Sequence, residues 1–249
     1  PPVANKESQF HYDYTWKDQV SKIDYYIDGS LSYTELCTYD KNGNMITKTD
    51  TRSTYLTQQY QWQGNQLISR KQASSENKMT YNDQGIRIRT TAESYTLEGN
   101  KVIAIHDTSG QITTFTYDAS GSLISMNYRG NEYYYVTNIQ GDVIEILDSN
   151  GHVMVKYYYD AWGNILQTVD NSNVSLSIAN PFRYRSYFYD KQSKLYYLNA
   201  RYYDPSIGRF ISPDSVSYLD DANATGYNLY AYCSNNPVMY SDPGGDFPV

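Results

Sequence analysis

The chain has 249 residues, of which 40% are hydrophobic, so it can bury one sizeable all-β core or two smaller ones. Its formal net charge of −7 argues against a general nucleic-acid binder, whose surface is usually basic. Tyrosine accounts for 30 residues. Because tyrosine favours strands and its hydroxyl needs a partner when buried, we expect sheets built from amphipathic rings.

The N-terminal segment predicts neither a targeting sequence nor a membrane span. Residues 1–10 (PPVANKESQF) lack the charged and apolar regions of a signal peptide. No later stretch holds about 18 consecutive apolar residues, the length that a spanning helix needs. We therefore expect no membrane segment in this chain, and since it does not begin with Met we interpret it as a fragment or a processed product.

A short motif recurs between residues 39 and 170. In each copy a glycine follows a tyrosine by four residues, and an apolar run begins two or three residues later. The six copies begin at Tyr39, Tyr60, Tyr81, Tyr95, Tyr117 and Tyr159, and Tyr135 begins a related copy with a longer loop.

This spacing is typical of β-hairpins. The tyrosine ends one strand, an Asp or Asn side chain can bond the turn backbone, and glycine adopts the positive φ that such a loop needs. A plain antiparallel sandwich with unrelated turns is the alternative, but the repetition favours an extended, curved ribbon of hairpins. Because a lone hairpin is marginally stable in water, neighbouring hairpins must stack on one another.

The Y-D-x-x-G-x-[LI] copies resemble the YD repeats of Rhs-family proteins, which are also found in insecticidal toxin-complex shells and in teneurins. The resemblance covers about residues 12–170. It implies that the hairpins belong to a hollow β-cage around a C-terminal toxic domain, and that this chain supplies the final turns of such a cage.

The pattern changes after residue 170. Residues 171–180 (NSNVSLSIAN) read as a polar connector, and strands are expected at Arg183–Tyr189 and Leu195–Tyr203 around a DKQSK hairpin loop. DPSIG predicts a turn before a short strand that Pro213 ends. Residues 228–237 (NLYAYCSNNP) predict a short helix with Asn228 as its N-cap.

Residues 195–245 resemble the Rhs-associated core region. The motifs R-Y-Y-D-P-x-x-G-R-F-x-x-x-D, N-x-Y-x-Y-x-x-N-N-P and D-P-x-G follow one another in that order. In the family this region plugs one end of the cage. In many members it also acts as an aspartic autoprotease that cuts the chain just after D-P-x-G and leaves the toxin free inside the shell.

Carried over position by position, the resemblance implies three catalytic residues, Arg201, Asp214 and Asp242. Two close carboxylates share a proton, so the ionised one can activate water while the protonated one donates to the scissile carbonyl. An arginine can hold one carboxylate ionised or polarise the oxyanion. Each residue also has a structural alternative: Asp214 as a cap of the following segment, Asp242 as the brace of an Asp-Pro turn, and Arg201 as a bridge between strands.

One departure bears on cleavage. Many cleaving members carry an apolar residue, usually Leu, after D-P-x-G, whereas this chain has Asp246. An acidic side chain is repelled by a carboxylate pair and fills an apolar peptide-binding pocket poorly. Cleavage is then either absent or displaced, and any cut is expected near residues 246–249.

Other residue types predict no further site. Cys37 and Cys233 lack metal-ligand or disulfide-framework spacing and are expected to be free, buried thiols. His11, His106 and His152 are scattered without metal-ligand spacing. We expect no metal and no cofactor.

Basic side chains gather in residues 181–210, where six of them stand against two acidic ones. In a chain that is otherwise acidic, such a segment more often has internal carboxylate partners than a nucleic-acid partner. We therefore expect these cations to form ion pairs within the fold.

Together these patterns predict an all-β protein. Residues 1–175 are expected to form a YD-repeat β-hairpin ribbon that is part of a curved shell, and residues 176–249 a small plug of mixed strands and short helix. The resemblance implies an encapsulating segment of a polymorphic toxin carrier, whose plug can release by autoproteolysis a C-terminal toxin encoded after Val249. The alternatives are a purely structural plug without protease activity and an adhesive or carbohydrate-binding YD-repeat module.

The resemblance also implies partners and a location. The partners are the C-terminal toxin domain of the same polypeptide, the remaining YD-repeat shell, and secretion-system or immunity proteins. The location is that of a secreted or cell-surface bacterial protein exported by a dedicated secretion system.

Overall fold

The computed structural model describes residues 5–214 and 228–246, and their regular structure is almost entirely antiparallel β-sheet. By its contacts the chain divides into two compact units: unit 1 is Pro1–Lys78 with Ile211–Tyr230, and unit 2 is Met79–Phe210 with Ala231–Val249. The expected division at residue 175 follows a change of sequence motif and stays a prediction. Among the described residues, no helix has the length and apolar character needed to cross a membrane.

Unit 1 is a seven-stranded sheet in which each strand pairs with the next along the chain. Its elements are β1 (Lys6–His11), β2 (Lys22–Ile27), β3 (Ser30–Tyr39), β4 (Met45–Asp50), the 3-10 turn η1 (Thr54–Leu56), β5 (Gln58–Gln63), β6 (Gln66–Gln72) and β7 (Ser75–Lys78). A later segment of the chain returns to this sheet. The amide of Met45 donates to the carbonyl of Ile211 at 2.9 Å, and the hydroxyl of Tyr230 donates to the carbonyl of Gly43 at 2.6 Å.

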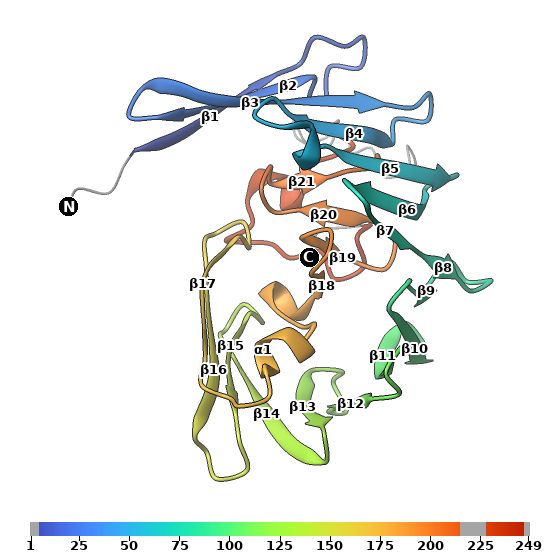
Figure 1. Ribbon diagram of the computed structural model, residues 1–249, viewed down its shortest axis with the longest axis vertical. Helices are drawn as coiled ribbons and strands as arrows, with labels where there is room; N and C mark the ends of the chain where they lie inside the picture. Colours follow the sequence, from blue (N-terminus) through green and yellow to red (C-terminus); the bar gives the residue numbers. More distant parts are fainter. Residues whose placement is uncertain (1–4, 215–227, 247–249) are drawn as a thin grey trace. The chain divides into compact units, whose positions relative to one another are not determined.

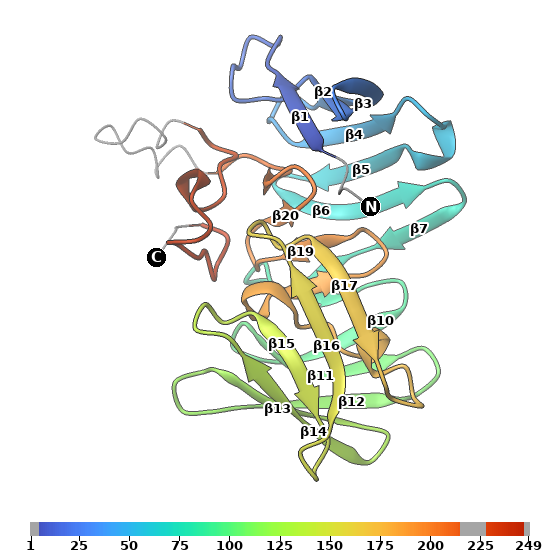
Figure 2. The ribbon, with the colours of Figure 1, turned by 90° about the vertical axis from the view of Figure 1, so that its left-hand side faces the viewer.

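Unit 2 is built on a ten-stranded sheet, again with each strand next to its neighbour in sequence. The strands are β8 (Thr80–Tyr81), β9 (Arg87–Arg89), β10 (Glu93–Glu98), β11 (Lys101–Asp107), β12 (Ile112–Tyr117), β13 (Leu123–Tyr128), β14 (Asn131–Thr137), β15 (Val143–Leu147), β16 (Val153–Tyr159) and β17 (Ile165–Asp170). Figure 1 shows this sheet curving round, and Figure 2 shows β15, β16 and β17 side by side. The predicted ribbon of β-hairpins is confirmed.

The rest of unit 2 is a small group of short elements. It comprises the one-turn helix α1 (Leu176–Ala179), η2 (Tyr184–Ser186), β18 (Phe188–Asp190), β19 (Leu195–Tyr197), β20 (Tyr202–Asp204), β21 (Arg209–Phe210) and η4 (Cys233–Asn235). Strands β18 to β21 form a four-stranded sheet in chain order. In Figure 1, α1 and β18 lie inside the curve of the ten-stranded sheet. This is the small, mixed structure expected of the C-terminal region.

The hairpin turns follow the predicted chemistry. At Asp118, Oδ1 accepts hydrogen bonds from the amides of Ser120 at 2.9 Å and Ser122 at 2.8 Å. The amide of Gly121 donates to the Asp118 carbonyl at 3.0 Å, and Gly121 has a φ of +86°. The same pattern recurs at Asp40, Asn82, Asp107, Asn138, Asp148 and Asp160.

Two of the six motif copies turn differently, so the prediction of one shared turn was wrong for them. Tyr60 and Tyr95 lie within β5 and β10 instead of ending a strand. Their hairpins close through two-residue loops at Gly64 and Gly99, where Gln63 pairs with Gln66 and Glu98 with Lys101. The residue after each of these tyrosines is not Asp or Asn, so no side chain of the described residues bonds the turn amides, and Gly-Asn forms the shorter loop instead.

The C-terminal strand predictions were partly right. The strand expected at Arg183–Tyr189 begins only at Phe188, because Tyr184–Ser186 form the turn η2. The DKQSK loop does join β18 to β19, and the DPSIG turn joins β20 to β21. The single strand expected at Leu195–Tyr203 is instead two strands, because the chain reverses at Asn199, which has a φ of +63°. The connector at residues 171–180 contains helix α1.

The short helix expected at residues 228–237 was wrong. Only the turn η4 forms, and Cys233, Ser234 and Asn235 have φ values of +50°, +51° and +62°. Left-handed residues cannot continue into a right-handed helix. Asn228 accepts from the amide of Tyr230 at 3.0 Å, which closes a local turn and caps no helix.

Candidate active site

The D-P-x-G motif at residues 242–245 forms a tight turn around the carboxylate of Asp242. Asp242 is 1% exposed, and its Oδ1 accepts from the amides of Gly245 at 2.8 Å and Asp246 at 3.1 Å. Gly245 has a φ of +80°, and a Cβ there would lie 2.7 Å from the carbonyl oxygen of Leu198. Asp242 therefore does brace this turn, and only glycine fits at its last position.

Arg201 holds the turn from the other side. It precedes β20 and is 5% exposed. Its Nη2 lies 3.6 Å from Oδ2 of Asp242, its Nε donates to the carbonyl of Gly245, and its guanidinium carbon lies 3.7 Å from the centroid of the Phe210 ring. The two backbone amides and the guanidinium stabilise the ionised form of the Asp242 carboxylate.

These two side chains meet at one peptide group, the one between Gly245 and Asp246. Arg201 donates to its carbonyl oxygen, and Asp242 accepts from its amide nitrogen. A cationic donor at a carbonyl oxygen is suited to stabilise the negative charge of a tetrahedral intermediate. A carboxyl group at the nitrogen is within reach to exchange a proton with it.

Asp214, the third predicted residue, belongs to unit 1, whereas Arg201 and Asp242 belong to unit 2. The amide of Asp214 donates to the carbonyl of Leu229 at 2.9 Å. The segment that Asp214 was expected to cap, residues 215–227, lies outside the described residues. The structure brings Arg201 and Asp242 together, and the pairing of Asp214 with Asp242 stays a prediction.

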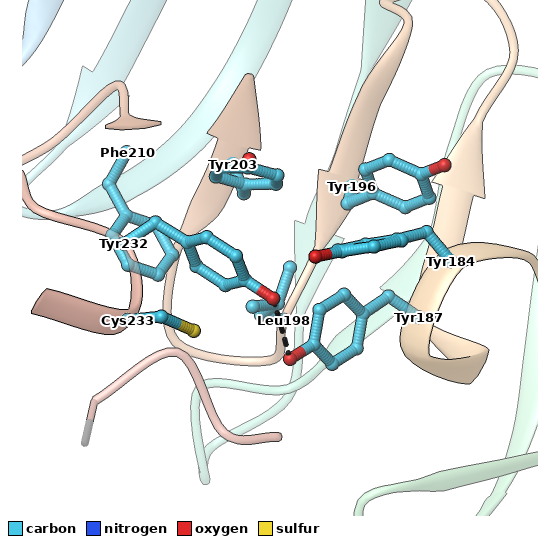
Figure 3. Packing of buried hydrophobic residues seen from close by; sticks show 8 residues of the cluster. All are labelled: Tyr184, Tyr187, Tyr196, Leu198, Tyr203, Phe210, Tyr232 and Cys233. Carbon is cyan, nitrogen blue, oxygen red and sulfur yellow. Dashed lines mark hydrogen bonds between the residues drawn. The ribbon is translucent and has the colours of Figure 1, made fainter. Parts of the chain in front are cut away.

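Tyrosine hydroxyls also contribute to the site, and the sequence analysis missed them. The amide of Asp242 donates to the hydroxyl of Tyr187 at 2.8 Å, and this hydroxyl lies 3.2 Å from that of Tyr232 (Figure 3). Burial raises the pKa of both phenols, so both stay neutral near physiological pH. The one signal in the sequence was the abundance of tyrosine, which does not single out these two.

The ring cluster in Figure 3 anchors the site in the core. Its members are all buried: Tyr184, Tyr187, Tyr196, Leu198, Tyr203, Phe210, Tyr232 and Cys233. Burial raises the pKa of the Cys233 thiol to about 12, so it stays protonated near neutral pH and is a poor nucleophile. The prediction that Cys37 and Cys233 are buried thiols outside any disulfide is confirmed.

No metal centre forms within residues 5–214 and 228–246: no group of three or more His, Cys, Asp or Glu side chains there could hold an ion. The three histidines instead contact single polar side chains. His11 lies 2.9 Å from Asp24, His106 lies 2.9 Å from Thr96, and His152 lies 3.1 Å from Asp148.

Two cations of the basic segment at residues 181–210, Arg185 and Arg201, have carboxylate partners of the kind expected. Arg185 lies 3.8 Å from Asp142, and Arg201 lies 3.6 Å from Asp242. An acidic residue of the segment, Asp190, lies 3.5 Å from Arg87.

Comparison with protein families gives a match to the teneurin YD-shell model over residues 100–238. Among curated proteins, the chain is 38% identical over 224 residues to the tRNA3(Ser)-specific nuclease WapA of Bacillus spizizenii. The match covers 85% of this chain and 9% of that protein. It is 37% identical over 224 residues to the tRNA nuclease WapA of Bacillus subtilis, with the same coverage. The chain therefore spans about a tenth of the length of these relatives.

Among solved structures, the chain is similar to a crystal structure of TcdB2-TccC3 with a TM-score of 0.68. The match covers 97% of this chain and 14% of that one, at 19% sequence identity. At this identity the likeness establishes the fold and nothing further.

Proposed function

Because the chain belongs to the teneurin YD-shell family and is of the Rhs/YD-repeat type, we propose that it is the shell-and-plug segment of a toxin carrier. The curved ten-stranded sheet of unit 2, with short C-terminal elements inside its curve, supports this proposal. So does the similarity to WapA nucleases, in which the matched part is a small share of the whole protein.

The cargo in this proposal is a C-terminal toxin domain encoded after Val249 on the same polypeptide. Its other partners are the rest of the YD-repeat shell and, in the producing cell, secretion-system and immunity proteins. A bacterial protein with this role acts outside the cell or at its surface. Negative-stain images of the full-length product should show a hollow particle, and solid or extended particles would contradict the carrier role.

We further propose that the plug cuts its own chain at or just after the Gly245–Asp246 bond. One observation carries this: Arg201 and Asp242 bind the carbonyl oxygen and the amide nitrogen of that peptide group. In the proposed reaction the carboxylate of Asp214 takes a proton from water, and the resulting hydroxide attacks the Gly245 carbonyl carbon. Arg201 stabilises the oxyanion, and the proton taken by Asp214 passes to Asp242, which gives it to the departing nitrogen.

The test is a chain that extends past Val249, followed by intact mass. Wild type should yield two fragments, while Asp214→Asn, Asp242→Asn and Arg201→Met should stay intact. Asp83→Asn, a change of an exposed turn aspartate in unit 2, is the matched control and should be cut like wild type. Asp246→Leu, which installs the apolar residue of many cleaving members, should cut faster.

Two outcomes would overturn the proteolytic step while leaving the carrier role intact. If wild type and Asp214→Asn give identical uncut chains, the plug is structural. If both give identical fragments, another residue performs the chemistry.

A further inference from the structure

Unit 2 contains a cavity of about 400 Å³ that the proposed function does not use. Six aromatic side chains line it: Tyr95, Tyr117, Phe182, Tyr187, Phe188 and Tyr197. Its volume falls within the 300–1,000 Å³ or so that is usual for small-molecule sites, which are mostly apolar with a few placed polar groups.

Three basic side chains, Arg87, Lys101 and Arg185, also line the cavity, and none of the described lining residues is acidic. Arg87 and Arg185 each have a carboxylate partner outside the lining, Asp190 at 3.5 Å and Asp142 at 3.8 Å. These two cations are therefore largely balanced, and the charge of the cavity depends on the third.

Lys101 is the unbalanced cation. Within the described part of the chain it forms no ion pair; its Nζ lies 5.3 Å from the centroid of the Tyr117 ring. The amino group also packs against Gly121, where a Cβ would lie 2.2 Å from Nζ. The cavity thus presents one uncompensated positive charge beside aromatic rings.

Arg87 adds a second feature that points to a ligand. Its side chain is 1% exposed, and its Nη1 donates to the hydroxyl of Tyr202 at 3.2 Å. Its Nε is buried and has no hydrogen-bond partner among the described residues. Since a buried donor without an acceptor costs free energy, an acceptor atom supplied by a ligand would be favourable there.

We propose that this cavity binds a small aromatic monoanion, with its rings among the aromatic side chains and its anionic oxygens at Lys101 and Nε of Arg87. A neutral aromatic molecule would leave Lys101 unpaired, and a small anion without rings would leave the apolar lining in water. A polyanion would bring more negative charge than the single unbalanced cation offers. The inference does not depend on autoproteolysis.

Isothermal titration of the 249-residue chain with three probes tests the chemistry. Naphthalene-2-sulfonate carries both the rings and the charge, 2-naphthalenemethanol carries the rings alone, and methanesulfonate carries the charge alone. The aromatic sulfonate should bind about tenfold or more tightly than the alcohol, because a hydrogen bond to a charged group contributes about that factor. Methanesulfonate should show no measurable heat.

Variants test whether the sulfonate binds in this cavity. Lys101→Met should weaken naphthalene-2-sulfonate binding about tenfold and leave the alcohol unchanged, and Lys101→Arg should keep most of the affinity. Lys71→Met, which removes an exposed lysine on β6 of unit 1, is the matched control and should bind like wild type.

A further measurement needs no variant: the sulfonate affinity should fall as NaCl rises, and the affinity for the alcohol should not. Equal affinities for sulfonate and alcohol, or a Lys101→Met chain that binds the sulfonate like wild type, would overturn the proposal. Salt-independent sulfonate binding would also overturn it.

Discussion

Replacing Tyr187 with Phe should destabilise unit 2 through the loss of one oxygen atom. That oxygen accepts from the amide of Asp242 at 2.8 Å and lies 3.2 Å from the hydroxyl of Tyr232. The variant keeps the ring, whose centroid lies 6.2 Å from that of Tyr184 and 6.4 Å from that of Tyr232, so the aromatic packing is retained. The change in stability therefore reports on hydrogen bonding.

The magnitude follows from burial. Asp242 is 1% exposed, so its amide cannot bond to water after the hydroxyl is gone. A buried donor left unsatisfied costs about 1–3 kcal/mol. We expect the free energy of unfolding to fall by about 2 kcal/mol and the Tm by about 4–8 °C, since each kcal/mol shifts Tm by about 2–4 °C in domains of 150–250 residues.

Two measurements check this prediction: thermal unfolding followed by circular dichroism, and hydrogen exchange at the amide of Asp242, which should become faster. Tyr158→Phe on β16 is the matched control, because Tyr158 is 47% exposed and its loss of a hydroxyl should change stability by less than about 0.5 kcal/mol. If the two variants have equal Tm values and the Asp242 amide stays protected, the argument from an unsatisfied donor is refuted.

Two further predictions concern the hairpin turns. Gly163 and Gly110 share a φ of +86°, but a Cβ at Gly163 would lie 2.6 Å from the Tyr184 ring, whereas a Cβ at Gly110 meets nothing within 4 Å. Gly163→Ala should therefore lower the free energy of unfolding by about 1–3 kcal/mol more than Gly110→Ala, as urea titrations of both would show. Hydrogen bonds from the side chain of Ser120 and from turn amides lower the pKa of Asp118. The ionised Asp118 carboxylate therefore stabilises the fold at pH values above its unfolded pKa of 3.8, and this stabilisation is lost as pH falls through the lower folded pKa. In Asp118→Asn, which keeps the acceptor without titrating, stability should change less than in wild type between pH 5 and pH 2; equal acid profiles would contradict this.

The turns show how far the sequence could predict the fold. The Asx-x-x-Gly spacing is a local property, because the side chain bonds amides two and four residues ahead, and it correctly predicted the turn at Asp118. The spacing of tyrosine and glycine alone misled at Tyr60 and Tyr95, where the residue after the tyrosine is not Asp or Asn and offers no such bond. The spacing of tyrosine and glycine was kept, but the local interaction that fixes the turn type was missing.

The candidate site was less predictable, because its contacts join residues far apart in sequence. The family motifs identified Arg201 and Asp242 as candidate site residues, and the two side chains do lie close together. The bond from the amide of Asp242 to Tyr187 spans 55 residues, and no spacing pattern predicts which hydroxyl an amide will reach. The left-handed turn at Cys233 was missed for a similar reason, since helix propensity and a capping residue say little when the chain must bend tightly beside a packed ring cluster.

Tyrosine has a role in this fold that phenylalanine could not perform, because the role requires a hydroxyl group. The last motif copy begins at Tyr159. In its turn, three successive carbonyls accept hydrogen bonds, those of Ala161, Trp162 and Gly163. The donors are the hydroxyls of Tyr184 at 2.9 Å, Tyr203 at 2.7 Å and Tyr196 at 2.9 Å. In an exposed hairpin turn, water normally donates hydrogen bonds to the carbonyls. A turn packed against the core therefore needs other donors. Each tyrosine supplies a buried ring and, at its tip, the donor that a water molecule would otherwise provide, so the C-terminal elements of unit 2 can pack against the sheet without leaving turn carbonyls unpaired.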